Sequence, residues 1–241
     1  MAALTLLGMG TFLVVCLVVA FRLLALACRT RALPEAAMGA GFLLVGGFGY
    51  GLIMASRAAL DTAPHLFPWL WGSGLGAVNL GIAFLALSTW RIFRPDARGR
   101  AVLAALVLGM FGGHLGHGLS PGFEQLGLHG PWAWLGYSGR ILAMGWGSWE
   151  SFHYAAQVRR QQRLGLGDAE VGRRCFWWGV GGACAMGIFV RNGIAQALGH
   201  DDPAAAGAAI PTIALGLGSS WAILRAFFWK ERRAAEPSTG A

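Results

Sequence analysis

The chain has 241 residues, of which 56% are apolar and only 12% are charged. A soluble domain carries about 25% charged residues, so this composition excludes an ordinary soluble protein and predicts an all-α membrane protein. The net charge of +8 would suggest a nucleic-acid partner in a soluble chain. Here the arginines are spread over short loops beside a predicted membrane surface, so we expect the lipid bilayer as a partner and no nucleic acid.

Seven apolar stretches follow one another along the chain, each long enough to cross a bilayer as a helix. They cover residues 4–28, 37–59, 69–90, 101–119, 132–156, 175–198 and 210–229. The first stretch lacks a basic segment before it and is too long for a cleavable signal, so we expect it to stay as a helix. Residues 1–229 are therefore predicted to form one transmembrane domain, and 230–241 a polar cytoplasmic tail.

Basic residues alternate between the two sides of the predicted bundle. The segments after the first, third, fifth and seventh stretches hold 14 lysines and arginines, whereas the other three connecting segments hold none. The positive-inside rule places the basic segments in the cytoplasm, so the N-terminus lies outside and the C-terminus inside. The predicted location is the cytoplasmic membrane of a prokaryote.

Two of the stretches share a pattern that indicates an internal repeat. A shift of 134 positions matches aromatic, glycine and arginine residues: Phe42 with Phe176, Gly47 with Gly181, and Arg57 with Arg191. A shift of 139 matches Trp90 with Trp229. The first three and last three helices would then be parallel repeats joined by the fourth helix.

This three-one-three layout resembles SWEET sugar transporters in size and topology, although the chain contains no Pro-Gln pair. Seven helices with an external N-terminus also resemble microbial rhodopsins, whose retinal-binding lysine lies midway along the seventh helix. The only lysine here, Lys230, follows the seventh stretch, so we expect no retinal.

Polar residues gather in the predicted outer half of the bundle, where they are costly and therefore candidates for function. Arg140 lies eight residues after Trp132, or about 12 Å from the outer face. The predicted ligand-binding residues are Asn79, His114, Arg140, Arg191, Asn192 and Gln196. We expect Arg140 and Arg191 to converge on an anion, with Trp132, Trp134 and Tyr137 as an aromatic rim. The alternative is that both arginines extend to outer headgroups, as we expect for Arg57, which lies one helical turn from Asp61.

His114 and His117 share a helix face, and imidazole is a common ligand of metals and haem. The further metal ligands at their height are all loop residues: His65, His129, His200 and Asp201. A haem would need a histidine on a facing helix, and His153 lies at the opposite membrane face. We therefore predict neither a metal site nor a cofactor, with haem at these histidines as an alternative.

Glu150 is predicted to lie in the inner third of the fifth helix, three residues before His153. We expect it to form an ion pair with Arg225 or Arg22, since both are also in the inner third. A role in proton relay is the alternative.

The sequence contains no phosphate loop, nucleophile elbow or HExxH motif, which disfavours an enzyme. The leading interpretation is a sensor or receptor that binds a small anionic or amphipathic ligand from the outer side. A cytoplasmic signalling partner is then needed, because the chain carries no output domain. The alternatives are a small-solute transporter built from two three-helix repeats, and a histidine-ligated haem or redox subunit.

Overall fold

The computed structural model describes residues 2–199 and 206–228, with side chains described for 10–199 and 210–228. Every regular element in these ranges is a helix. They are α1 (Ala2–Thr30), α2 (Leu33–Phe42), η1 (Leu43–Tyr50), α3 (Gly51–Thr62), η2 (Pro64–Leu66), α4 (Phe67–Phe93), α5 (Ala97–Leu119), η3 (Gly122–Glu124), α6 (Gly130–Gln162), α7 (Ala169–Ala197) and α8 (Ala206–Phe228). His200, Asp201, Trp229, Lys230 and the predicted tail lie outside the described residues.

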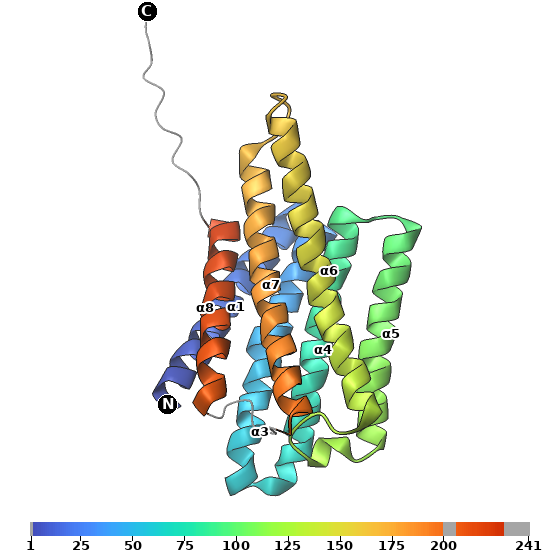
Figure 1. The fold of residues 1–241 in the computed structure, drawn as a ribbon, viewed down its shortest axis with the longest axis vertical. Coiled ribbons are helices and arrows are strands. Elements are labelled where there is room, and N and C mark those ends of the chain that lie inside the picture. Colours follow the sequence, from blue (N-terminus) through green and yellow to red (C-terminus); the bar gives the residue numbers. More distant parts are fainter. Residues whose placement is uncertain (1, 200–205, 229–241) are drawn as a thin grey trace, which may run out of the picture.

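The bundle is made of seven long helical segments, which we call rods. α2, η1 and α3 follow one another without a break and form the second rod, and each of the other long helices is a rod by itself. The rods pack in chain order, each against the next, and α1 closes the ring against α8 (Figure 1). α4 also contacts α6 and so holds an interior position. The predicted all-α bundle of seven helices is confirmed.

Five of the rods are long and apolar enough to cross a membrane: Gly10–Thr30, Leu33–Thr62, Pro64–Phe93, Ala97–Leu119 and Ile210–Phe228. The other two, α6 and α7, carry the charged residues that lower their hydropathy, among them Arg140, Glu150 and Arg191. α6 and α7 pack against each other, and this pair lies between two apolar helices, with α5 against α6 and α8 against α7. The chain is an integral membrane protein whose two most polar helices are adjacent.

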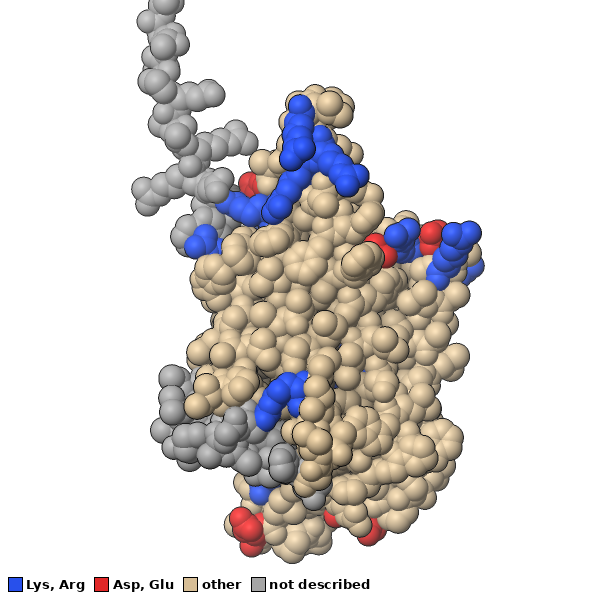
Figure 2. Space-filling view, viewed as in Figure 1, with Lys and Arg blue, Asp and Glu red and all other residues tan. Residues whose placement is uncertain are grey.

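The helices continue beyond the apolar stretches from which their ends were predicted. α6 has 33 residues, or about 50 Å at 1.5 Å per residue, against a hydrocarbon core of about 30 Å. The α6–α7 hairpin therefore projects beyond the neighbouring rods (Figure 1). Basic side chains gather at this end of the bundle, with a few acidic ones among them, whereas acidic side chains predominate at the opposite end (Figure 2). We call these the basic end and the acidic end.

The second rod contains a π-helical segment, η1, of eight residues. α7, its partner in the predicted repeat, is α-helical throughout. A π-helix advances differently per turn, so equal residue counts do not produce equal rotation along the two rods. The repeat therefore remains a prediction.

Glycines bring the second rod and α4 into backbone contact. A Cβ at Gly81 would lie 2.8 Å from the carbonyl oxygen of Gly41, and one at Gly41 would lie 2.9 Å from that of Gly81. Gly49 likewise meets the backbone nitrogen of Val78 at 3.1 Å from such a Cβ. These contacts fix α4, and with it Asn79, relative to the second rod.

Candidate functional site

Arg140 lies in the interior of the bundle, 7% exposed, on the face of α6 that packs against α4. Its Nε donates a hydrogen bond to Oδ1 of Asn79, at 2.7 Å. Its guanidinium carbon lies 5.7 Å from the centre of the Tyr137 ring, one turn earlier on α6. Tyr137 is itself fixed by its hydroxyl, which donates to the carbonyl oxygen of Phe189 on α7 at 2.8 Å. The position of Arg140 is therefore set by three helices.

No carboxylate balances this buried charge among the described residues. Nε is the only nitrogen of Arg140 that donates a hydrogen bond there, so its two terminal amino groups have no partner in that part of the protein. Desolvating a cation without a counter-ion is expensive, and the amide of Asn79 compensates only one of its donors. The arrangement leaves a positive charge with unused donors inside the bundle.

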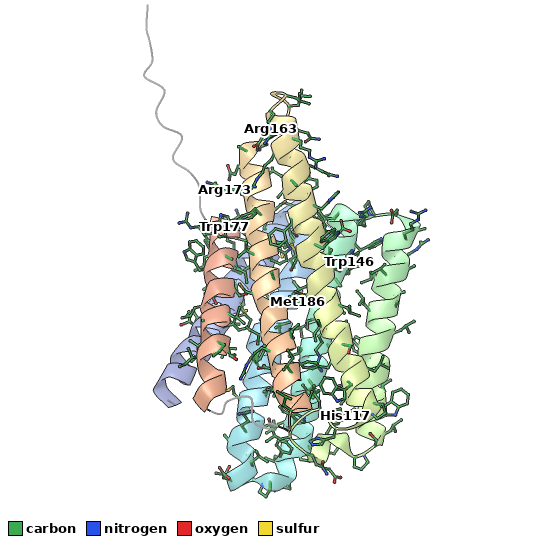
Figure 3. The ribbon with its side chains drawn as sticks, in the orientation of Figure 1. His117, Trp146, Arg163, Arg173, Trp177 and Met186 are labelled. Carbon is green, nitrogen blue, oxygen red and sulfur yellow. The ribbon has the colours of Figure 1, made fainter. Side chains whose placement is uncertain are left out.

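A cavity of about 70 Å³ adjoins this arginine, towards the acidic end. The rods α4, α5 and α6 surround it, with η3 and the following loop at its end. Figure 3 shows His117 at this end, far from Arg163 at the tip of the α6–α7 hairpin. The cavity is lined by Trp71, Leu75, Gly113, His114, His117, Phe123, Gly127, Leu128, Trp132, Ala133, Gly136, Tyr137, Arg140 and Gln196.

The polar groups around the cavity are mainly hydrogen-bond donors. The indole Nε1 of Trp71 is buried and has no hydrogen-bond partner in the part of the chain that the structure describes. Gln196 on α7 uses its side-chain oxygen to accept from the backbone nitrogen of Leu128, at 2.5 Å, so its amino group remains as a donor. Together with the terminal amino groups of Arg140, these donors favour a ligand that carries acceptor atoms and negative charge.

His114 and His117 both contact Phe123, a residue of η3, with ring centres 5.0 Å apart in each case. The Nδ1 of His117 is buried, lies against Gly122 and has no hydrogen-bond partner within residues 2–199 and 206–228. Within the described residues, no three histidine, cysteine, aspartate or glutamate side chains lie close enough together to hold a metal ion. The two rings form a wall of the cavity, closed by Phe123.

The predicted site residues are divided between two places. Arg140, Asn79, His114 and Gln196 come together, with Asn79 acting through Arg140 and the other three lining the cavity. The predicted aromatic rim is partly present, since Trp132 and Tyr137 also line it.

Arg191 does not converge with Arg140. Its Nη1 donates to Oδ1 of Asn192 at 2.9 Å and to Oγ1 of Thr212 on α8 at 3.0 Å. The second of these contacts directs Arg191 towards α8. Neither Arg191 nor Asn192 lines the cavity.

The predicted partner of Glu150 is wrong. Its carboxylate accepts from Nε of Arg94 at 2.9 Å and from Nε1 of Trp146 at 3.3 Å. Arg225 and Arg22, the expected partners, lie over aromatic rings of α7 and α8 instead. α4 ends at Phe93, so Arg94 is the first residue after it and lies beside α6, not in a free loop.

Sequence reasoning missed Trp71 and Phe123. Tryptophan near the end of a membrane helix is typical of an interfacial belt, and this pattern concealed the inward direction of Trp71. Phe123 belongs to a short loop whose path over α4 and α5 no periodicity indicates. Gly72 and Gly118 leave room for its ring, since a Cβ at either would lie 3.0 or 2.8 Å from it, but this contact is evident only once the helices are placed.

No protein-family model matches this chain, and no curated protein or solved structure is significantly similar to it.

Proposed function

We propose that this membrane protein is a sensor or receptor that binds a small anionic ligand, or the anionic head of an amphipathic one, beside Arg140. The observation that carries the proposal is a buried arginine without a carboxylate partner among the described residues, at the wall of a cavity with donor groups. An anion would supply both the missing charge and the missing acceptors.

The size of the cavity limits the ligand. An engineered cavity of about 150 Å³ holds benzene, and the present one has about half that volume. It therefore suits a carboxylate or a similarly small oxyanion. In an amphipathic ligand, only this head would enter, and the apolar part would lie beyond Trp132, which is exposed on its other side.

Packing towards the basic end supports a ligand that enters from the acidic end. Ile82, Met110 and Ala143 are almost fully buried and belong to one apolar cluster contributed by α4, α5 and α6. This cluster fills the interior between the three rods, so the described conformation offers binding from one end without a path through the bundle. Signalling then needs a cytoplasmic partner that detects a change in the helices.

Binding can be measured on the purified protein with acetate, benzoate and octanoate, each compared with its neutral amide. We expect the carboxylates alone to raise the melting temperature. Arg140→Gln should weaken the best of them by about ten- to a hundredfold, because a hydrogen bond to a charged group contributes about 1.5–3 kcal/mol. Arg57→Gln, the same substitution on α3 and away from the cavity, serves as the matched control.

Equal binding of amides and carboxylates, or unchanged binding by Arg140→Gln, would contradict the proposal. Proteoliposomes separate the two kinds of function: a receptor binds the carboxylate without net flux, whereas flux that Arg140→Gln abolishes would indicate a transporter.

The membrane orientation has its own test. A reporter active only in the cytoplasm, fused after Ala241, should give full signal, and one active only outside should give none. The reverse result would place the cavity on the cytoplasmic side, so that the ligand would have to come from the cytoplasm.

A further inference from the structure

The α6–α7 hairpin continues well beyond the ends of the neighbouring rods (Figure 1). Nε of Arg94, the first residue after α4, lies 2.9 Å from Oε1 of Glu150, so α4 ends at the level of Glu150. The side chain of Arg94 is 48% exposed, which places this level at the membrane surface and not in the hydrocarbon core. α6 continues from Glu150 to Gln162, which is about 18 Å at 1.5 Å per residue. Each headgroup layer is only about 5–7 Å thick, so the end of the hairpin lies in water beyond the headgroups.

The two helices stay packed together along this projecting part. Val158, eight residues after Glu150, is only 4% exposed. A Cβ at Gly172 of α7 would lie 3.0 Å from Cγ1 of Val158, so the glycine allows α7 to approach α6 closely. Asp168 caps α7, because its side chain accepts a hydrogen bond from the backbone nitrogen of Glu170 at 2.8 Å. The projection is therefore a built hairpin and not a loose loop.

The turn between the two helices has a fixed backbone. α6 ends in a Schellman motif, in which the backbone nitrogen of Leu166 donates to Gln161 and that of Gly165 donates to Gln162, both at 3.0 Å. Gly165 has a φ of 73°, the left-handed conformation that this motif requires. A Cβ at Gly167 would lie 2.7 Å from a backbone oxygen of α6, so the chain returns directly against that helix. Side chains at the turn are therefore presented on an ordered framework.

Two leucines project from this turn. Leu164 is 74% exposed and Leu166 is 80% exposed. The residue in the position of Leu166 commonly packs against the last turn of its own helix, but that turn offers Gln161 and Arg160, and Leu166 stays exposed. Exposed leucines in the membrane-spanning part contact lipid, whereas this pair lies in water. Neighbouring apolar side chains in water favour burial against another molecule.

Arginines surround the two leucines. Residues 159–174 hold five arginines against one aspartate and one glutamate, a net charge of +3. Figure 2 shows this basic surface at the end of the hairpin, and Figure 3 shows Arg163 at its tip. Arg160 and Arg163 are exposed and come directly before the leucines. The positive-inside rule accounts for basic residues after a membrane helix. It requires neither a packed hairpin beyond the headgroups nor exposed leucines beside the arginines.

We propose that the end of this hairpin, residues 159–174, is a docking surface for an acidic protein on the side that the positive-inside rule assigns to the cytoplasm. Leu164 and Leu166 enter an apolar depression of the partner, and Arg160 and Arg163 face the carboxylates around it. An apolar centre with a charged rim is the usual composition of a protein interface, and a rigid framework lowers the entropic cost of binding. An anionic membrane surface matches the charge, but the headgroups end about 10 Å before the turn.

This surface names the partner that the proposed receptor needs, and to that extent the inference rests on the proposed function. α6 runs without a break from the level of Arg140 to Gln162, so one helix joins the cavity to the docking surface. A displacement of α6 at the cavity would therefore move the hairpin.

Site-specific cross-linking in the cells that make the protein tests the proposal. A benzophenone amino acid in place of Gln161, an exposed neighbour of both leucines, keeps the proposed contacts intact. We expect it to capture an acidic protein, which mass spectrometry identifies. The identified protein is then purified, and its binding to the full chain in phosphatidylcholine nanodiscs is measured. Leu166→Ser should weaken this binding by about tenfold, because an apolar side chain is no longer buried.

The arginines are tested with the same purified partner. The double variant Arg160→Gln, Arg163→Gln should slow association and make the binding less sensitive to salt, because rim charges act mainly on the rate of encounter. Arg98→Gln, Arg100→Gln removes the same charge from exposed residues at the start of α5 and should bind like wild type. Leu119→Ser, at a leucine that is 88% exposed at the acidic end, is the matched control for Leu166→Ser. Melting temperatures confirm that each variant is folded.

Three results would overturn the docking surface. They are cross-linking to lipid alone or to no protein, affinity that neither hairpin substitution changes, and equal losses in the controls. Cross-linking to lipid would indicate that the hairpin lies on the membrane. Arg140→Gln should leave partner binding intact, and the hairpin variants should bind carboxylates like wild type, so either proposal can fail while the other stands.

Discussion

α6 carries two buried charges ten residues apart, and their surroundings differ. Glu150 and Arg140 are each 7% exposed. Glu150 accepts hydrogen bonds from a cation and an indole, Arg94 and Trp146, whereas Arg140 donates to a neutral amide and lies over a phenol ring. Judged by burial alone, the two charges would be equally costly to remove from water.

The difference lies in what each charge leaves unsatisfied. Glu150 is neutralised by Arg94 and does not line the cavity beside Arg140, so its contacts are explained by structure. Arg140 keeps a net charge and unused donors beside a cavity. A buried charge therefore indicates a ligand only when its protein partners have been counted, and this comparison predicts opposite responses to substitution.

The largest expected effect is on stability at the basic end. Arg94→Gln leaves the carboxylate of Glu150 buried without a counter-ion, which should destabilise the protein by about 3–5 kcal/mol. Glu150→Gln should cost only about 1 kcal/mol, because Arg94 is 48% exposed and its charge can be hydrated. Thermal unfolding in detergent measures both variants. Equal losses of stability in the two variants would contradict the expectation that the buried carboxylate of Glu150 depends on this ion pair more than the exposed guanidinium of Arg94 does.

Asn79→Asp would give Arg140 a counter-ion within the protein, as Glu150 already has. The new carboxylate would replace the amide to which Nε of Arg140 now donates. Without ligand, this variant should be more stable than wild type, by about 1.5–3 kcal/mol for a charge-assisted hydrogen bond. Carboxylate binding should fall by about ten- to a hundredfold, because the charge is now neutralised within the protein. Asn79→Leu, which removes the acceptor without adding charge, should lower stability. Tighter carboxylate binding by Asn79→Asp would contradict the assignment of Arg140.

A smaller effect is expected at the unpaired indole of Trp71. Trp71→Phe removes a donor that has no partner among the described residues, so the unliganded protein should melt at the same temperature or slightly higher. Carboxylate affinity should fall by about three- to tenfold, as expected for one hydrogen bond of about 0.5–1.5 kcal/mol. Trp69→Phe is the control, since Trp69 is 77% exposed two residues earlier. If both variants bind like wild type, the ligand does not reach Trp71.

Hydropathy and charge were sufficient to predict the seven helices, because both follow from the solvent that surrounds each segment. The partners of buried charges were not predictable in the same way. Arg94 was assigned to a solvated loop because it lies outside the apolar stretch, yet α4 continues to Phe93 and brings it to Glu150. Spacing placed Arg140 and Arg191 at similar depth but could not define the rotation that turns one towards α4 and the other towards α8.

The glycine contacts between the second rod and α4 have a consequence for how this sequence can change over generations. Gly41 and Gly81 face each other's carbonyl oxygens, so alanine at either position would force the backbones apart and displace Asn79. Gly109 and Gly112 on α5 have nothing within 4 Å of an added Cβ, so they are free to drift to alanine. Descendants of this chain should therefore diverge quickly at Gly109 and Gly112, whereas the cavity wall of α5 should stay as fixed as that of α4, because a Cβ at Gly113 would collide with the backbone nitrogen of Gly136.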